Sequence, residues 1–248
     1  VNIVMHIAPY GVFALMAKTF AQQGLDLIIP MMSYFGAVAL VLLLHLTGTL
    51  MLLLKLLGRA SPLVFLKKMR AAQIFAFSTS SSNATIPVTL TTVEKRIGVD
   101  NSTASFVVPF GATINMDGTA IMQGVATVFI ANVYGIELGL MGYLTVILMA
   151  VLASIGTAGV PGVGLIMLAM VLNQVGLPVE GIALIMGVDR LLDMMRTAVN
   201  VTGDATITTI VARSEKSLDM NTFDDPRAGL IDPDIHLPHK QPAAETKA

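Results

Sequence analysis

The sequence predicts an all-α polytopic membrane protein, in which transmembrane helices accompany two re-entrant helical hairpins that enter from opposite sides. Three observations support this fold class. The 248 residues are 54% hydrophobic and only 12% charged, whereas soluble domains contain about 25% charged residues. Stretches rich in Lys and Arg alternate with stretches that contain neither. Two apolar segments are broken at their centres by small or polar residues, which is typical of a ligand site at mid-membrane.

The basic residues predict how the chain is threaded through the membrane. Lys and Arg cluster at 55–70, 95–96 and 213–216, and they are absent from 20–30, 131–145 and 173–187. The positive-inside rule places the basic regions in the cytoplasm and the others outside. Solvated turns would explain each cluster alone, but the alternation favours a topology signal. The expected location is the plasma membrane, which is the inner membrane in a bacterium.

Two membrane helices are expected within residues 1–60, one near 3–20 and one over 27–57, where the only ionisable groups are Lys55 and His45. The chain begins at Val1 inside an apolar stretch, so we expect further helices to precede it. The mean hydropathy of +0.77 agrees with a multi-span protein. The absence of Cys excludes a disulfide framework and thiolate chemistry.

A first hairpin is expected at about 71–93, because both ends of this segment adjoin cytoplasmic basic regions. Its ends are apolar and its middle is Ser-rich, so a flexible linker is the alternative. The segment at about 143–175 is broken by Gly and Pro at 156–164. Its ends adjoin the basic-free external regions, which predicts a second hairpin from the other side. A single kinked helix is the alternative there.

Between the two hairpins, the apolar segment 104–131 is broken near its centre at 115–119, with the sequence NMDGT. Asp-Gly preceded by Asn is a turn signal. Non-helical backbone at mid-membrane depth is tolerated only where it lines a cavity or is buried in protein. The unwound turn exposes carbonyl oxygens, which suit a hard cation such as sodium.

The last expected helix, 180–212, places six polar or charged residues within an arc of about 100°. These residues are Asp189, Asp193, Arg196, Thr197, Asn200 and Asp204. An ionisable group at mid-membrane costs roughly 2.5–3.5 kcal/mol, so these groups, together with Arg190, should face a protein interior that binds something polar. A set of ion pairs without any ligand is the alternative, but a local Asp193–Arg196 pair explains only two of the six.

The stripe predicts that some of its residues bind a small zwitterion and that others bind a cation. Arg196 can bind a carboxylate through two parallel hydrogen bonds, and Asp193 can bind an ammonium group. Thr197 and Asn200 can form hydrogen bonds with the rest of the molecule. Asp204, with Asn115 and carbonyls of the broken helix, offers oxygen ligands only, which favours a hard cation.

Four motifs, in this order, resemble those of the dicarboxylate/amino acid:cation symporter family, the glutamate transporter homologues. They are SSSNATIP (80–87), GATINMDGT (111–119), ASIGTAGVPG (153–162) and DMMRTAVNVTGD (193–204). The resemblance extends to about residue 215 and implies an elevator-type transport core over 61–213, trimeric assembly and sodium-coupled symport of glutamate or aspartate. It also implies that the first four of eight membrane helices lie outside this chain. Proton-coupled glutamate symport or C4-dicarboxylate symport is the nearest alternative.

The resemblance also implies a role for each matched residue. The substrate would be bound by Ser80, Ser81, Ser82, Thr119, Val160, Gly164, Asp193, Arg196, Thr197 and Asn200. Val160 and Gly164 would cover it from the second hairpin tip, which acts as the outer gate. Sodium would be bound by Gly111, Asn115, Asn200 and Asp204; by Thr113, Ser154, Ile155 and Thr157; and by Asn115 and Asp117 with a helix outside this chain. The chain departs from the family at Asn83, where many members have Ser, and at Ser80 and Met194, neither of which is Arg.

Other classes remain open at this stage. An intramembrane aspartyl protease also places two Asp on membrane helices, and Asp117 and Asp204 invite that comparison. Its Gly-x-Gly-Asp pattern is absent, however, and Arg196 lies between the two carboxylates, so we expect no enzyme. A pure ion channel is a third interpretation. No cofactor beyond the coupling ions and no nucleic acid is expected. The polar, Pro-rich tail 214–248 should be disordered and cytoplasmic, with His236 and His239 solvated.

Overall fold

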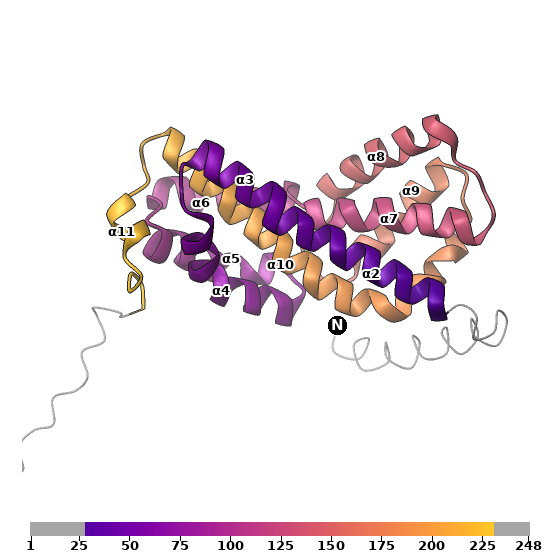
Figure 1. Cartoon of the computed structure of the whole chain (residues 1–248), viewed down its shortest axis with the longest axis horizontal. Helices are drawn as coiled ribbons and strands as arrows, with labels where there is room; N and C mark the ends of the chain where they lie inside the picture. The colour runs from indigo at the N-terminus through magenta and orange to yellow at the C-terminus, as the bar shows by residue number, and fades with distance from the viewer. Residues whose placement is uncertain (1–27, 231–248) are drawn as a thin grey trace, which may run out of the picture.

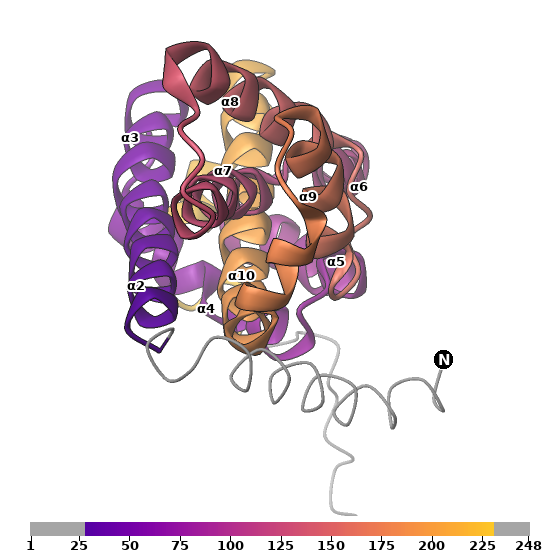
Figure 2. The same cartoon turned by 90° about the vertical axis from the view of Figure 1, so that its right-hand side faces the viewer.

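The computed structural model describes residues 28–230, and every regular element in that part of the chain is a helix. The longest is α10 (Ile182–Ser214), whose 33 residues span about 50 Å at 1.5 Å per residue. In Figure 1 it runs beside α2 (Ile28–Leu44) and α3 (Met51–Leu53). The helices between 62 and 114 gather toward one end of α10, and those between 117 and 174 gather toward the other. Figure 2 shows the same arrangement from the side of α9.

The helix that contains α2 and α3 is continuous from residue 28 to residue 58. Two π-helical segments, His45–Leu50 and Leu54–Gly58, lie within it. Among residues 28–230 it is the one helix long and apolar enough to cross a membrane, over Ile29–Gly58. Its bounds agree with the span expected at 27–57. The helix expected near 3–20 lies outside the described residues.

Two pairs of helices are each joined by a short turn, and the partners of each pair pack against one another. The first pair is α4 (Pro62–Thr79) and α5 (Ser82–Thr91), which continues as a π-helical segment to Ile97. It begins about nine residues earlier than the segment expected from the charge pattern. The second pair is α8 (Gly139–Ile155) and α9 (Val163–Gln174), within the segment expected at 143–175 apart from the first turn of α8.

The turn of the first pair is built by its serines. Ser80 ends α4 with a left-handed backbone, at φ 51°. Ser81 then caps α5, because its hydroxyl oxygen accepts a hydrogen bond from the backbone N–H of Ala84 at 3.2 Å. The Ser-rich run is therefore a tight helix-to-helix turn and not a flexible linker.

The broken helix forms as α6 (Asn101–Ile114) and α7 (Asp117–Val133), separated by Asn115 and Met116. The break is shorter than the five residues that the sequence suggested. Asp117 and Gly118 already belong to α7, because a carboxylate is favourable in the first turn of a helix.

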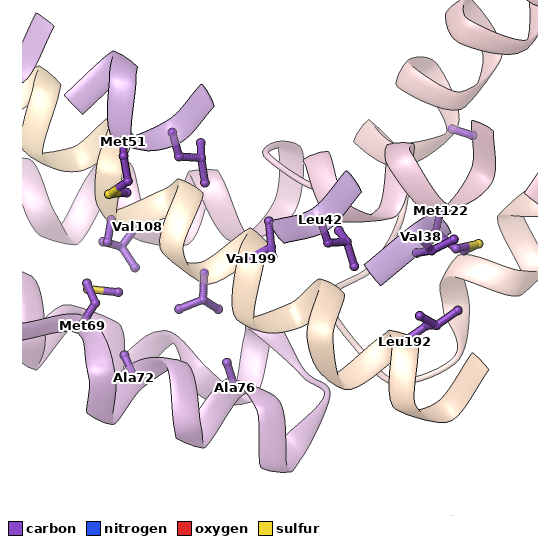
Figure 3. Packing of buried hydrophobic residues seen from close by; sticks show 14 of the residues in the cluster. Val38, Leu42, Met51, Met69, Ala72, Ala76, Val108, Met122, Leu192 and Val199 are labelled. Atoms are coloured by element: carbon purple, nitrogen blue, oxygen red, sulfur yellow. The ribbon is translucent and has the colours of Figure 1, made fainter. Parts of the chain in front are cut away.

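One buried apolar cluster joins α10 to the helices around it. Figure 3 shows members from α2, α3, α4, α6 and α7 spread along α10, which contributes Leu192 and Val199. The opposite faces of several helices are apolar and exposed; Leu140 is 75% exposed and Met141 74%. Exposed apolar surface on this scale is rare on soluble monomers and fits contact with lipid.

The C-terminal segment 215–230 is ordered, although the sequence suggested a disordered tail from residue 214. It contains the short helix α11 (Met220–Asp224), whose Phe223 is buried. Lys68 of α4 fastens it: the Nζ ammonium donates to the carbonyl oxygens of Arg96 at 2.5 Å, Thr222 at 2.7 Å and Asp225 at 2.9 Å. These bonds use all three ammonium donors, which ties the segment to the base of the α4–α5 pair. Residues 231–248 lie outside the described part.

We expect Lys68→Met to release this segment. The substitution removes three hydrogen bonds from a charged donor, so it should destabilise the protein by about 2–4 kcal/mol and expose 215–230 to trypsin at Lys216 and Arg227. Thermal unfolding and limited proteolysis in detergent would measure both effects. Lys67→Met is the matched control, because Lys67 is exposed. Equal trypsin sensitivity in the two variants would refute the role of Lys68.

Candidate functional site

The two helix turns, the break between α6 and α7, and the middle of α10 meet around one small cavity. Nine of the ten residues expected to bind substrate line it: Ser80, Ser82, Thr119, Val160, Gly164, Asp193, Arg196, Thr197 and Asn200. Its volume is about 20 Å³, which is room for about one water molecule. The tenth residue, Ser81, does not line the cavity but holds the two turns together.

Direct contacts between the turns close this cavity. The Ser81 hydroxyl donates to the carbonyl oxygen of Gly159 at 2.7 Å, and the backbone N–H of Asn83 donates to the same oxygen at 3.1 Å. The backbone N–H of Gly162 donates to Oδ2 of Asp193 at 3.1 Å, which fastens the second turn to α10. A ligand larger than water can therefore enter only after these turns separate.

Arg196 is the largest fully buried side chain of the described residues, with 1% of its surface exposed. Its two terminal nitrogens donate to separate carboxylates of the same helix, to Asp189 at 3.1 Å and to Asp193 at 2.8 Å. Its Nε has no hydrogen-bond partner among the described residues. Three of the five guanidinium N–H groups thus remain available. Arg190, in contrast, is exposed, so the expectation that it faces the protein interior is wrong.

Asp204 lies beyond this cavity on α10 and is 2% exposed. Its Oδ1 accepts a hydrogen bond from the Asn115 side chain at 3.0 Å. Gly111 lies directly against it: a Cβ at this position would be 2.7 Å from the same oxygen. Asn200, one turn earlier, accepts a hydrogen bond from the N–H of Gly118 at 2.8 Å. The structure therefore brings the first expected sodium set together.

The second expected sodium set is not assembled in the described structure. Thr113 is exposed, and its hydroxyl donates to the carbonyl of Pro109 in its own helix at 3.2 Å. The hydroxyls of Ser154 and Thr157 likewise donate to α8 carbonyls, at 2.8 Å each. Ile155 is exposed.

The third expected set, Asn115 and Asp117, involves a residue that sequence reasoning missed. The Nε2 atom of His45 lies 2.6 Å from Oδ2 of Asp117. His45 begins the first π-helical segment of its helix, and such irregularities are frequent at functional sites. A lone His in a long apolar span was the available signal. The other carboxylate oxygen of Asp117 has no partner within residues 28–230.

Four further residues line the cavity although they were not expected to contact substrate: Met116, Thr157, Ala158 and Gly159. Met116 lies in the break before α7, and the other three form the turn of the second pair. Backbone proximity explains all four, because a turn that closes over a small cavity presents consecutive residues to it.

Comparison with known proteins identifies the family of the chain. The profile described as Sodium:dicarboxylate symporter family matches residues 1–214. The chain is 40% identical over 215 residues to the Proton/sodium-glutamate symport protein of Bacillus subtilis (strain 168), which covers 87% of this chain and 50% of that protein. It is 42% identical over 207 residues to Excitatory amino acid transporter 1 of Homo sapiens, which covers 83% and 38%. The chain thus spans half or less of the length of these curated relatives.

The contact between the turns yields a direct test. A Cβ on Gly159 would lie 2.5 Å from Oδ1 of Asn83, so we expect Gly159→Ala to force the turns apart. Overpacking costs about 1–3 kcal/mol, so maleimide labelling of a buried Ser82→Cys reporter should accelerate about tenfold. Gly156→Ala is the control, because its nearest non-local atom would be 3.5 Å away. Equal labelling rates in the two backgrounds would contradict closure by this contact.

Proposed function

Because the chain belongs to the sodium:dicarboxylate symporter family, we propose that it forms the substrate- and ion-binding part of a secondary active symporter. The proposed cargo is an acidic amino acid, glutamate or aspartate, coupled to sodium. One observation carries this proposal. The buried guanidinium of Arg196, the carboxylate of Asp193, the Ser-rich turn and the Gly-rich turn all line one small cavity. A second buried carboxylate, that of Asp204, lies beside it.

The charges of the cavity match an acidic amino acid. Arg196 retains free N–H groups for the side-chain carboxylate of the substrate. Oδ2 of Asp193 accepts a hydrogen bond from the backbone N–H of Gly162, and the carboxylate can also bind the substrate ammonium. The hydroxyl of Ser80 is buried without a partner among the described residues, so it is free to donate to the main carboxylate. Thr119, Thr197 and Asn200 add uncharged hydrogen-bonding groups around these three.

The neighbourhood of Asp204 matches a hard monovalent cation. A buried carboxylate that is hydrogen-bonded only to a neutral amide carries a large desolvation cost. A sodium ion held by Asp204, Asn115, Asn200 and backbone oxygens would neutralise it, and oxygen ligands suit this ion. Asp117, with one free carboxylate oxygen, offers part of a further site. The second expected sodium set could assemble only after the hydroxyls of Thr113, Ser154 and Thr157 break their hydrogen bonds to helix carbonyls.

The transport cycle follows from the closed geometry. Substrate entry requires separation of the two turns, and the 156–162 turn is the natural gate because Gly and Pro make up four of its seven residues. We propose that both helix pairs are re-entrant hairpins, that the 61–213 core moves as an elevator within a homotrimer, and that the 215–230 segment faces the cytoplasm. Exposed apolar faces and the family resemblance support these points.

A proton-coupled or dicarboxylate-preferring symporter is the second candidate. It is favoured by the name of the Bacillus subtilis relative, Proton/sodium-glutamate symport protein, and by the family name. The aspartyl protease hypothesis is excluded, because the chain belongs to a symporter family.

Uptake in proteoliposomes would test the proposal. For the full-length protein we expect a sodium gradient to drive L-[³H]aspartate accumulation, and a proton gradient alone to drive little. Asp204→Asn removes the charge that the ion neutralises, so its half-saturating sodium concentration should rise about tenfold or more. Glu137→Gln is the control, because Glu137 is exposed in the loop between α7 and α8. Uptake driven equally by protons without sodium would favour the second candidate. An unchanged sodium titration would remove Asp204 from the ion site.

Arg196→Cys should abolish uptake of acidic amino acids and admit neutral ones. Losing one partner of a buried, hydrogen-bonded charge pair costs about 2–5 kcal/mol, so the KM for aspartate should rise by at least 30-fold. Arg190→Cys is the matched control on the same helix, since Arg190 is exposed. Substrate competition assays with serine and aspartate would measure this change in selectivity from acidic to neutral amino acids. Unchanged aspartate uptake would refute the carboxylate-binding role.

A further inference from the structure

Asp189 is a buried carboxylate to which the proposed function assigns no role. It is 4% exposed, and its Oδ1 lies 3.1 Å from a terminal nitrogen of Arg196. It does not belong to the residues that line the cavity, whereas Asp193 and Arg196 do. Asp189 therefore does not line the space that a substrate would occupy, and its carboxylate is bonded to Arg196, which does. It precedes Asp193 by four residues and Arg196 by seven, so all three lie on one face of α10.

The charges of these three side chains sum to −1, from two carboxylates and one guanidinium. The surroundings screen this charge poorly, because all three are largely buried, with side-chain exposures of 1%, 6% and 13% for Arg196, Asp189 and Asp193. Tyr34 of α2 is itself 2% exposed, and α2 packs against α10. In such surroundings a single charge acts over many ångströms.

We propose that Asp189 is a specificity-determining positioning residue, which sets the selectivity between acidic amino acids and C4-dicarboxylates. This inference rests on the proposed function. An acidic amino acid carries a net charge of −1, because its ammonium compensates one carboxylate, whereas succinate carries −2. A net charge of −1 on Asp189, Asp193 and Arg196, at and directly behind the cavity wall, disfavours the dianion more than the monoanion. Asp193 alone would neutralise Arg196; Asp189 supplies the excess negative charge.

Tethering is the second part of the role. Asp189 and Asp193 hold different terminal nitrogens of Arg196, so the guanidinium plane is fixed by two anchors. The remaining N–H groups then have a defined direction. A carboxylate that both fixes the donor and adds charge should influence the ratio of substrate affinities and not merely the overall activity.

The experiment compares KM values for L-aspartate and succinate in proteoliposomes containing the full-length protein. We expect Asp189→Asn to lower the ratio of the succinate KM to the aspartate KM by about tenfold or more. Asp189→Glu keeps the charge and should keep the wild-type ratio, even where a displaced guanidinium raises both KM values. Glu180→Gln removes one carboxylate from the exposed turn that precedes the same helix and should change nothing.

Each outcome decides the proposal. A folded Asp189→Asn variant with the wild-type ratio would overturn it, and so would an Asp189→Glu variant whose ratio shifts toward succinate. If Asp189→Asn binds but does not transport, the shift of its melting temperature by each ligand supplies the same ratio. If it does not fold, the Asp189→Glu ratio decides. Wild-type protein that accumulates no acidic amino acid would refute the proposed function itself, whereas a normal wild type with an unmoved ratio refutes only this inference.

Discussion

The buried guanidinium of Arg196 is the group on which the rest of the site depends, because a cation that is 1% exposed must be matched by anions. Its partners come from its own helix, at the spacings that place side chains on one face. Removing one partner of such a pair typically costs 3–5 kcal/mol, so the three side chains fix one another. The cavity forms where this rigid face meets the two turns, and its polarity is set before any ligand arrives.

Close approach of backbones makes this polar centre possible. Gly111, Gly118 and Gly203 each lie against a polar side chain of another segment: a Cβ would be 2.7 Å from Asp204 Oδ1, 2.9 Å from Asn200 Oδ1 and 2.8 Å from Asn115 Nδ2, respectively. Any larger residue would separate α6, α7 and α10 at this level. Along α10 itself, the hydroxyls of Thr202, Thr206, Thr208 and Thr209 donate to carbonyls four residues earlier. The helix is therefore polar in sequence, yet each of these hydroxyls has a partner within α10; Thr202 in addition accepts a hydrogen bond from the side chain of Gln73 of α4 at 3.0 Å.

Much of this arrangement could be predicted from the sequence, because charge in an apolar chain is informative. The stripe on α10 predicted four of the residues that line the cavity, Asp193, Arg196, Thr197 and Asn200, and the motif resemblance implied the other five expected residues that line it. Contacts between distant segments were not predictable. The pairing of His45 with Asp117 depends on a π-helical segment that leaves no composition signal. The order of 215–230 depends on Lys68, whose three carbonyl partners are backbone atoms. Arg190 was wrongly expected to face the protein interior, because helical periodicity alone does not show where the buried face of α10 ends.

Under the proposed function, the segment 115–119 would be a structural element common to the substrate site and the cation site. At one end, the Asn115 amide is bonded to Asp204 at 3.0 Å. Further along, the Gly118 N–H is bonded to Asn200 at 2.8 Å, and Thr119 faces the cavity. A cation that draws Asn115 and Asp204 together displaces the same short segment that presents Thr119 to the substrate. Coupling requires an element with two arrangements that both ligands bias, and under the proposed function the turns at Ser81 and Gly159 would separate to supply the second arrangement. Since the cavity measures only about 20 Å³, each ligand would then bind the open arrangement first, and the 115–119 segment would connect the two sites.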